Sequence, residues 1–191
     1  VHGEGCNHDH GDGHHHHHHG AGGHHHHDGH DVSALLGPDG GPLGPQQSFR
    51  CTRFGVTCDQ GGSTTDAMNQ VGTKNQCHPN ENSQYLEKVQ NYVDFLKGIK
   101  TYPTKVIVAG IMGTTEPFQV ELRAPPNGGA AQQALGHSCS YMGANGTEVA
   151  DPPTRIKFLL DQFPNRSTYT TICQQNLSDG LTLIAQLLKT V

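Results

Sequence analysis

Hydrophobic positions recur with a helical period in residues 82–100, NSQYLEKVQNYVDFLKGIK. The apolar side chains fall three or four positions apart, and most charged side chains lie between them. They are Tyr85, Leu86, Val89, Val93, Leu96 and Ile99. Ser83 precedes most of them and has the hydroxyl that N-cap positions favour. The pattern predicts an amphipathic helix over residues 82–100 with Ser83 as its N-cap.

Two further helices are predicted towards the C-terminus. Residues 151–163, DPPTRIKFLLDQF, offer Asp151 as an N-cap and prolines in the first turn, where a missing N–H costs nothing. Residues 178–191, SDGLTLIAQLLKTV, repeat leucines and an isoleucine on one helical face. Both segments are therefore expected to cover a sheet with their apolar sides.

Three segments read as strands. Residues 104–113, TKVIVAGIMG, form a short apolar run rich in β-branched residues, which is typical of a strand buried on both faces. Residues 117–126, PFQVELRAPP, alternate apolar and polar positions, and residues 167–173, STYTTIC, are rich in strand formers. The order of helices and strands predicts an α/β fold in which helices flank a largely parallel sheet.

Two regions lack such a pattern. Residues 48–82 contain three cysteines among many Asn, Gln and Thr, and we interpret them as an irregular region held by cross-links. Residues 124–147 are interpreted as a Gly/Ala-rich loop that carries Cys139. Both are predicted to lack extended regular structure.

The N-terminal part of the chain has a different composition. Residues 1–31 consist almost entirely of Gly, His and Asp, a low-complexity composition that cannot bury enough surface to fold alone. Residues 37–45, GPDGGPLGP, are a Pro/Gly hinge. We therefore divide the chain into a disordered tail with its hinge, residues 1–47, and an α/β domain, residues 48–191.

The six cysteines, Cys6, Cys51, Cys58, Cys77, Cys139 and Cys173, contain no CxxC pair. Their spacing fits neither a zinc ribbon nor a zinc finger, so a disulfide framework is predicted, with its connectivity open. Disulfides persist in oxidising compartments, which predicts an extracellular, periplasmic or outer-envelope location. The chain starts at Val1 without a basic-then-apolar leader, as a mature secreted protein or a piece of a longer one would.

Charge and hydropathy narrow the classes of partner. The net charge is −5 at pH 7, and the 12 Lys and Arg residues do not cluster, which argues against nucleic acid. No apolar run reaches the length of a transmembrane helix. Protonation of all 16 His would change the formal charge from −5 to +11, so a surface association that depends on pH is conceivable.

Several segments of residues 48–191 resemble the C-terminal half of a known family. The segments are SFRCTRFGVTCD, YPTKVIVAGIMG, PFQVELRAPP, HSCSYMG, VADPPTRIKFLLDQFPNRS and TICQQNLSDGLTLIAQLLK. They resemble cysteine-rich bacterial envelope relatives of the von Willebrand factor A (VWA) domain, most of which have no assigned function. The resemblance implies a partial VWA-like, Rossmann-type layer that is incomplete at its N-terminal side.

The resemblance does not supply a metal site. VWA domains hold a divalent ion through a DxSxS loop that follows the first strand. In this chain Asp31 and Ser33 are followed by Ala34 and Leu35, so the second serine is missing. No residue can therefore be assigned to the ion site of that family.

The strongest chemical signal is the histidine-rich tract, which contains 14 of the 16 His within the first 30 residues. Neutral imidazole binds Zn, Ni, Cu and Co, and carboxylates can complete the coordination. The predicted ligands are His8, His10, His14, His15, His16, His17, His18, His19, His24, His25, His26, His27, His30 and Asp28. We expect weak binding at several sites, foremost of zinc or nickel, with no metal integral to the fold. The alternatives are a purification tag, suggested by the run of six at 14–19, and a linker without function.

The sequence contains weaker candidate metal ligands, and each of them has an alternative interpretation. The segment His8–Asp9–His10, beside Cys6 and His2, could form a tighter metal site from Cys, His and Asp, or Cys6 could pair with a cysteine of the domain. His78 lies next to Cys77 and His137 lies close to Cys139. Isolated histidines of this kind are more often solvated or hydrogen-bonded than bound to a metal ion.

A hydrolase would need a nucleophile, and GHSCS at 136–140 lacks the second glycine of a nucleophile elbow. The sequence thus predicts a non-enzymatic binding module whose partners are metal ions. The alternative is a structural or adhesive protein that recognises a protein or a surface, with the tail as a spacer.

Overall fold

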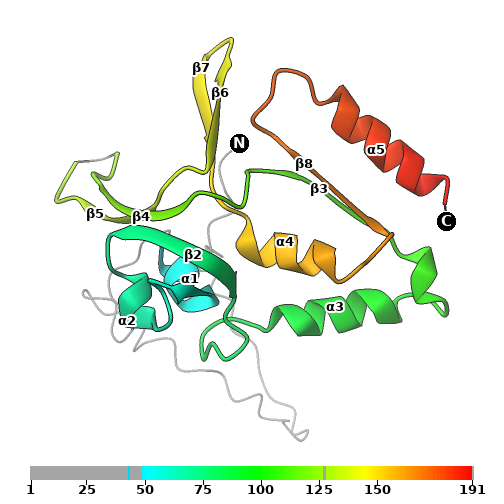
Figure 1. Cartoon of the computed structure of the whole chain (residues 1–191), viewed down its shortest axis with the longest axis horizontal. Coiled ribbons are helices and arrows are strands. Elements are labelled where there is room, and N and C mark those ends of the chain that lie inside the picture. The colour runs from blue at the N-terminus through cyan, green and yellow to red at the C-terminus, as the bar shows by residue number, and fades with distance from the viewer. Residues whose placement is uncertain (1–42, 44–48, 127, 191) are drawn as a thin grey trace, which may run out of the picture. The chain divides into compact units, whose positions relative to one another are not determined.

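The computed structural model describes residue 43 and residues 49–126 and 128–190, and Figure 1 shows their arrangement. The chain divides into two units, Val1–Arg50 and Cys51–Val191. Nearly all described residues belong to the second unit, which is mixed α/β. The predicted tail, residues 1–47, lies outside the described residues apart from Leu43.

A four-stranded antiparallel sheet occupies the first half of the second unit. Its strands are β1 (Val56–Gln60), β2 (Gly72–Pro79), β4 (Phe118–Arg123) and β5 (Gln132–Leu135), in the order β1-β2-β4-β5. Short helices accompany it, α1 (Phe49–Gly55) before β1 and α2 (Thr65–Met68) before β2. The Thr64 hydroxyl caps α2 by accepting a hydrogen bond from the Ala67 N–H.

The core of this sheet is small and closed. It consists of Val56, Cys58, Met68 and Phe118, with Cys77 and Leu135 packed against them. Residues 48–82 were predicted to be an irregular region held by cross-links; the cross-link is confirmed by the Cys58–Cys77 disulfide, but the irregularity is wrong, because β1, α2 and β2 lie there. The signal was weak because β2 buries only Lys74 and Pro79, so its sequence shows no apolar alternation.

A separate two-stranded sheet pairs β3 (Val108–Met112) with β8 (Ser167–Thr171) in parallel, with Val108 opposite Ser167. The prediction of mostly parallel strands is wrong for the described residues, because every other strand pair among them is antiparallel. Antiparallel neighbours need only short connections, whereas parallel ones need a long crossover. The chain provides such a crossover between β3 and β8.

A hairpin of β6 (Cys139–Gly143) and β7 (Gly146–Ala150) projects from the unit (Figure 1). A two-residue turn joins these strands, and Gly146 adopts a φ of 115°, which glycine tolerates best. The prediction of a loop over residues 124–147 is therefore wrong for β5 and most of the hairpin. Their residues are half-buried or exposed, so little apolar patterning marked them.

The three predicted long helices are present but shorter than expected: α3 (Val89–Gly98), α4 (Thr154–Asp161) and α5 (Ser178–Leu188). The 3-10 turn η3 (Pro103–Lys105) follows α3. Glu81, not Ser83, caps α3: its carboxylate accepts hydrogen bonds from the Val89 and Gln90 N–H groups, at 3.0 and 3.2 Å. Pro153, not Asp151, occupies the N-cap position of α4.

Helix α4 connects the two sheets, since it contacts β2 as well as β3 and β8 (Figure 1). A second core forms around Val89, Val93 and Phe163, where α3 meets the end of α4. Helix α5 packs on β8 through Gly180, where a Cβ would lie only 2.4 Å from Thr170 Cγ2. In the described part of the chain, no helix is long and apolar enough to cross a membrane.

Candidate functional site

The fourteen residues predicted to bind metal all lie outside the described residues. The structure therefore does not show whether His8 to His30 and Asp28 converge, and the metal site stays a prediction. Elsewhere in the described chain, no group of three or more His, Cys, Asp or Glu residues is placed to hold a metal ion.

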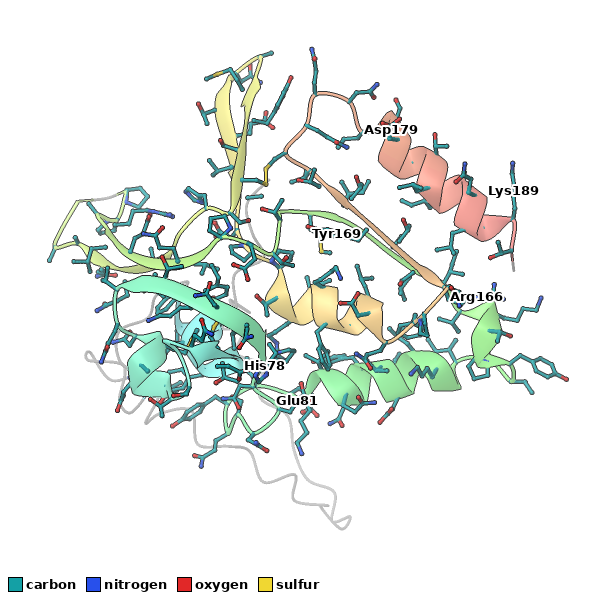
Figure 2. The ribbon with its side chains drawn as sticks, in the orientation of Figure 1. His78, Glu81, Arg166, Tyr169, Asp179 and Lys189 are labelled. Carbon is teal, nitrogen blue, oxygen red and sulfur yellow. A yellow bond between two sulfur atoms is a disulfide. The ribbon has the colours of Figure 1, made fainter. Side chains whose placement is uncertain are left out.

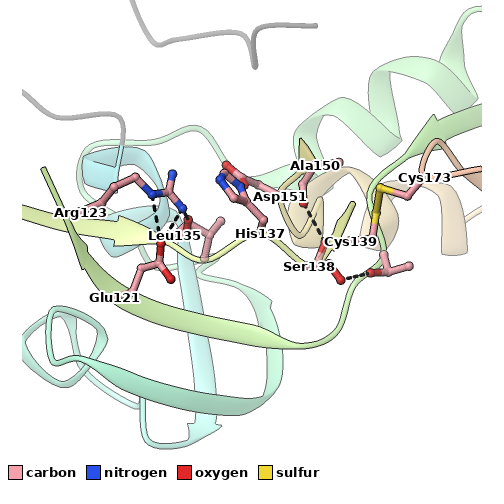
Figure 3. Close-up of polar contacts among 10 residues, drawn as sticks. Glu121, Arg123, Leu135, His137, Ser138, Cys139, Ala150, Asp151 and Cys173 are labelled. Atoms are coloured by element: carbon pink, nitrogen blue, oxygen red, sulfur yellow. Dashed lines mark hydrogen bonds and ion pairs between the residues drawn. A yellow bond between two sulfur atoms is a disulfide. The ribbon is translucent and has the colours of Figure 1, made fainter. Parts of the chain in front are cut away.

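Two His–Asp pairs lie in the described region. His78, labelled in Figure 2, lies on β2. Its Nε2 lies 3.3 Å from Asp59 Oδ1, and its Nδ1 lies 3.2 Å from the Pro79 carbonyl oxygen. His137 Nδ1 lies 2.6 Å from Asp151 Oδ1 (Figure 3). Each histidine is thus engaged in a hydrogen bond, His78 from strand β2 and His137 from the connection between β5 and β6.

The GHSCS segment is held by structural contacts. Ser138 is 8% exposed, and its hydroxyl donates to the Ala150 carbonyl at 3.3 Å (Figure 3). Cys139 forms a disulfide with Cys173. The neighbouring His137 bonds Asp151, and the described residues show no hydrogen bond between His137 and Ser138. The segment is arranged as a disulfide-bearing connection between β5 and β6.

The predicted disulfide framework is confirmed. Cys58 on β1 pairs with Cys77 directly opposite on β2, and Cys139 on β6 pairs with Cys173 beyond β8. Cys51 is disulfide-bonded as well. The part played by Cys6 lies outside the described residues.

A cavity of about 260 Å³ lies against one face of α4, and we call it the α4 cavity. Its helical wall is formed by Thr154, Lys157, Phe158 and Asp161, which are spaced i, i+3, i+4 and i+7. Such a stripe lies on one side of a helix. Three of its four residues are polar, although helix stripes that face a neighbouring element are ordinarily apolar.

The opposite wall comes from β2 and the loop between β3 and β4. Gln76 and Cys77 line it from β2, and Glu116 lines it from the loop. Gln76 has a φ of 56°, in the left-handed region that few residues other than glycine adopt. Sequence reasoning missed this site because its walls come from segments far apart in the chain. The polar stripe on α4 was the one available signal.

The positive and negative side chains that line the α4 cavity do not fully neutralise one another. Lys157 Nζ lies 2.6 and 2.7 Å from the two carboxylate oxygens of Asp161, so these two charges neutralise each other. Glu116 Oε2 accepts a hydrogen bond from the Phe118 N–H at 3.1 Å. Among the described residues, Glu116 forms no ion pair, which leaves the cavity with net negative charge.

Two titratable groups outside the α4 cavity, the buried Lys74 and the half-buried Tyr169, have shifted pKa values. Burial lowers the pKa of Lys74 below its ordinary value of 10.5, while its Nζ donates to the Ala67 carbonyl at 2.9 Å. Burial raises the pKa of the Tyr169 phenol above its ordinary value of 10.0. The Tyr169 hydroxyl donates to the Gly113 carbonyl, which ties β8 to the end of β3 (Figure 2). Both groups stabilise local structure.

No family model, curated protein or solved structure matches this chain.

Proposed function

We propose that the protein is a non-enzymatic binding module whose histidine-rich tract binds divalent transition metals. The observation that carries the proposal is the concentration of 14 of the 16 His in the first 30 residues, interleaved with aspartates. Imidazole and carboxylate groups in a Gly-rich segment suit Zn, Ni, Cu or Co without imposing a single geometry. The expected result is weak binding of several ions per chain.

The disulfides support a location outside reducing compartments. The two described disulfides each cross-link one half of the α/β unit. Disulfide bonds persist in extracellular or periplasmic surroundings. We therefore place the protein in the extracellular space, the bacterial periplasm or the outer envelope.

The proposal includes a structural relationship between residues 48–191 and VWA domains. The observation that supports it is the parallel β3–β8 pair, with α4 and α5 packed against it. The antiparallel sheet β1-β2-β4-β5 would then be an addition to that layer.

The test is a titration of the full-length chain with zinc and with nickel by isothermal calorimetry. The variant has glutamine at all ten positions of the runs 14–19 and 24–27, and its matched control has His78→Gln and His137→Gln. We expect the variant to lose most bound ions and the control to keep them. Binding by the wild type should also weaken between pH 7.5 and 5.5, because protons compete for the imidazole nitrogens. Equal binding by the variant and the wild type would overturn the proposal.

A second function is favoured by one surface. Helix α3 buries Val89 and Val93 on one side, yet Tyr92, Phe95 and Ile99 on another side are at least half exposed. Exposed apolar surface of this kind marks sites of interaction with proteins or other surfaces. An adhesive domain, with the N-terminal segment as a spacer, is therefore the alternative if the titration shows no metal binding.

A further inference from the structure

The α4 cavity combines features that ordinary packing does not require. Helix α4 contacts β2, and the residues that line the cavity from the helix include Thr154, Lys157 and Asp161. A buried face built only for stability would be expected to bring apolar side chains to this position. Phe158 is the one apolar member, and it also packs against the core around Val93.

Thr154 offers a hydroxyl group to a molecule in the cavity. The residue is only 9% exposed, and it lines the cavity at the first turn of α4. Within the described chain its hydroxyl makes no hydrogen bond, and its oxygen is accessible from the cavity rather than sealed in the core. A bound molecule with a hydrogen-bonding group would provide a partner.

The loop that carries Glu116 is fixed in place. Thr114 Oγ1 lies 2.8 Å from the Glu116 carbonyl oxygen and 2.9 Å from the Ser138 carbonyl oxygen. Glu116 Oε2 is engaged by the Phe118 N–H, and no hydrogen bond to Oε1 is formed within the described residues. Glu116 is an exposed residue that lines the cavity, and its second carboxylate oxygen is open to a further hydrogen bond.

We propose that the α4 cavity binds a small organic cation that carries a protonated amine. The ammonium group hydrogen-bonds Glu116 Oε1, and a polar group elsewhere on the ligand hydrogen-bonds the Thr154 hydroxyl. A charge-assisted hydrogen bond of this kind is stronger than a neutral one. Because Asp161 neutralises Lys157, the residual charge of the cavity favours a cation over an anion.

The volume limits the ligand to a small molecule. A cavity of 260 Å³ corresponds to roughly nine water molecules at about 30 Å³ each. This is slightly below the usual range of small-molecule pockets. A short aliphatic amine with one further polar group is a suitable probe, and 4-aminobutan-1-ol has this chemistry.

The experiment measures binding of 4-aminobutan-1-ol to the full-length protein by calorimetry, with EDTA present so that metal on the histidine-rich tract does not contribute. Butane-1,4-diol and succinate serve as neutral and anionic counterparts of similar length. We expect saturable binding of the amine that weakens as salt is added. Glu116→Gln should weaken it by about tenfold or more, and Thr154→Val by a smaller factor.

The matched control is Glu148→Gln, which removes an exposed carboxylate from the β6–β7 hairpin outside the cavity. It should leave the affinity unchanged, and circular dichroism verifies that each variant is folded. The proposal is overturned if the amine does not bind saturably, if Glu116→Gln and Thr154→Val both bind it as the wild type does, or if the diol or succinate binds as tightly. None of these outcomes depends on metal binding by the tract.

Discussion

The four-stranded sheet and the β3–β8 pair differ in how completely they are enclosed. In the sheet, Phe118 and Cys58 are fully buried, and a disulfide links β1 to β2 at directly opposed positions. In the β3–β8 pair, every residue of β8 is only half-buried. Helices α3 and α5 also have large apolar side chains that are exposed to solvent. The four-stranded sheet buries its core with a few large side chains and a disulfide bond. The β3–β8 pair instead depends on helices that pack over a narrow sheet.

The difference follows from strand direction. Antiparallel strands can pair through short connections and leave one face in contact with water. Parallel strands ordinarily need cover on both faces, and two strands alone make a small surface to cover. Stability in the second region therefore comes from α4 and α5, and we expect that region to open more easily.

The largest effect should come from Phe118→Ala, which tests whether the sheet core holds the unit together. Phe118 is 0% exposed, so truncation should lower the free energy of unfolding by about 3–5 kcal/mol. Phe95→Ala is the matched control, because Phe95 is 68% exposed on α3 and its loss should change stability by about 0.5 kcal/mol or less. Urea denaturation followed by circular dichroism measures both. Equal losses would mean that the outer face of α3 is also covered, and the contrast between the regions would fail.

The second-largest effect should come from removal of a disulfide, and it distinguishes the regions that the two disulfides stabilise. The double change Cys58→Ala, Cys77→Ala should cost on the order of 3 kcal/mol, since the bridge closes a loop with a sequence separation of 19. Cys139→Ala, Cys173→Ala removes the bridge with a separation of 34 and should cost a similar amount. Hydrogen exchange should show faster exchange in β1 and β2 for the first variant, and in β6, β7 and β8 for the second. The same pattern in both variants would show that the regions unfold as one.

The smallest effect concerns Tyr169 and depends on pH. Tyr169→Phe removes the hydrogen bond to the Gly113 carbonyl and should cost about 1 kcal/mol at pH 8. Because burial raises the pKa of Tyr169, the folded state holds the phenol proton more tightly than the unfolded chain does. The contribution of this proton is complete below the unfolded pKa of 10.0 and is lost as pH rises through the folded pKa.

The measurement is the stability difference between wild type and Tyr169→Phe in urea at pH 8 and at pH 10.5. We expect the difference to shrink at the higher pH. A difference that stays constant would show that the Tyr169 phenol is not desolvated, and that the β3–β8 pair is more open to solvent than the half-buried residues of β8 indicate.

The success of the sequence predictions followed the strength of the hydrophobic pattern. The strand at Val108–Met112 and the three long helices were located because their apolar positions are frequent or periodic, and the strand at Ser167–Thr171 because it is rich in strand-forming residues. The strands β1, β2, β5 and β6 were missed because they are short, polar or only half-buried. Helix ends shifted where a distant group replaced the local cap, as Glu81 does for α3.

The candidate sites show the same division. A histidine-rich tract is visible in any single sequence, because its residues are consecutive. The α4 cavity joins Gln76, Glu116 and Thr154, which no local pattern connects. The one clue, a polar stripe on a helix, indicates a cavity only after β2 has been placed opposite it.

The sequence by itself determined the helices and strands with strong periodicity, the oxidised state of the described cysteines and the concentration of imidazole in the first 30 residues. These features depend on composition and on neighbours along the chain. Only the tertiary structure decided which strands pair and in which direction, that Cys58 joins Cys77 and Cys139 joins Cys173, and that Glu116 and Thr154 line one cavity. The reason is that such contacts depend on loop closure and burial across the whole unit, which local residue preferences do not encode.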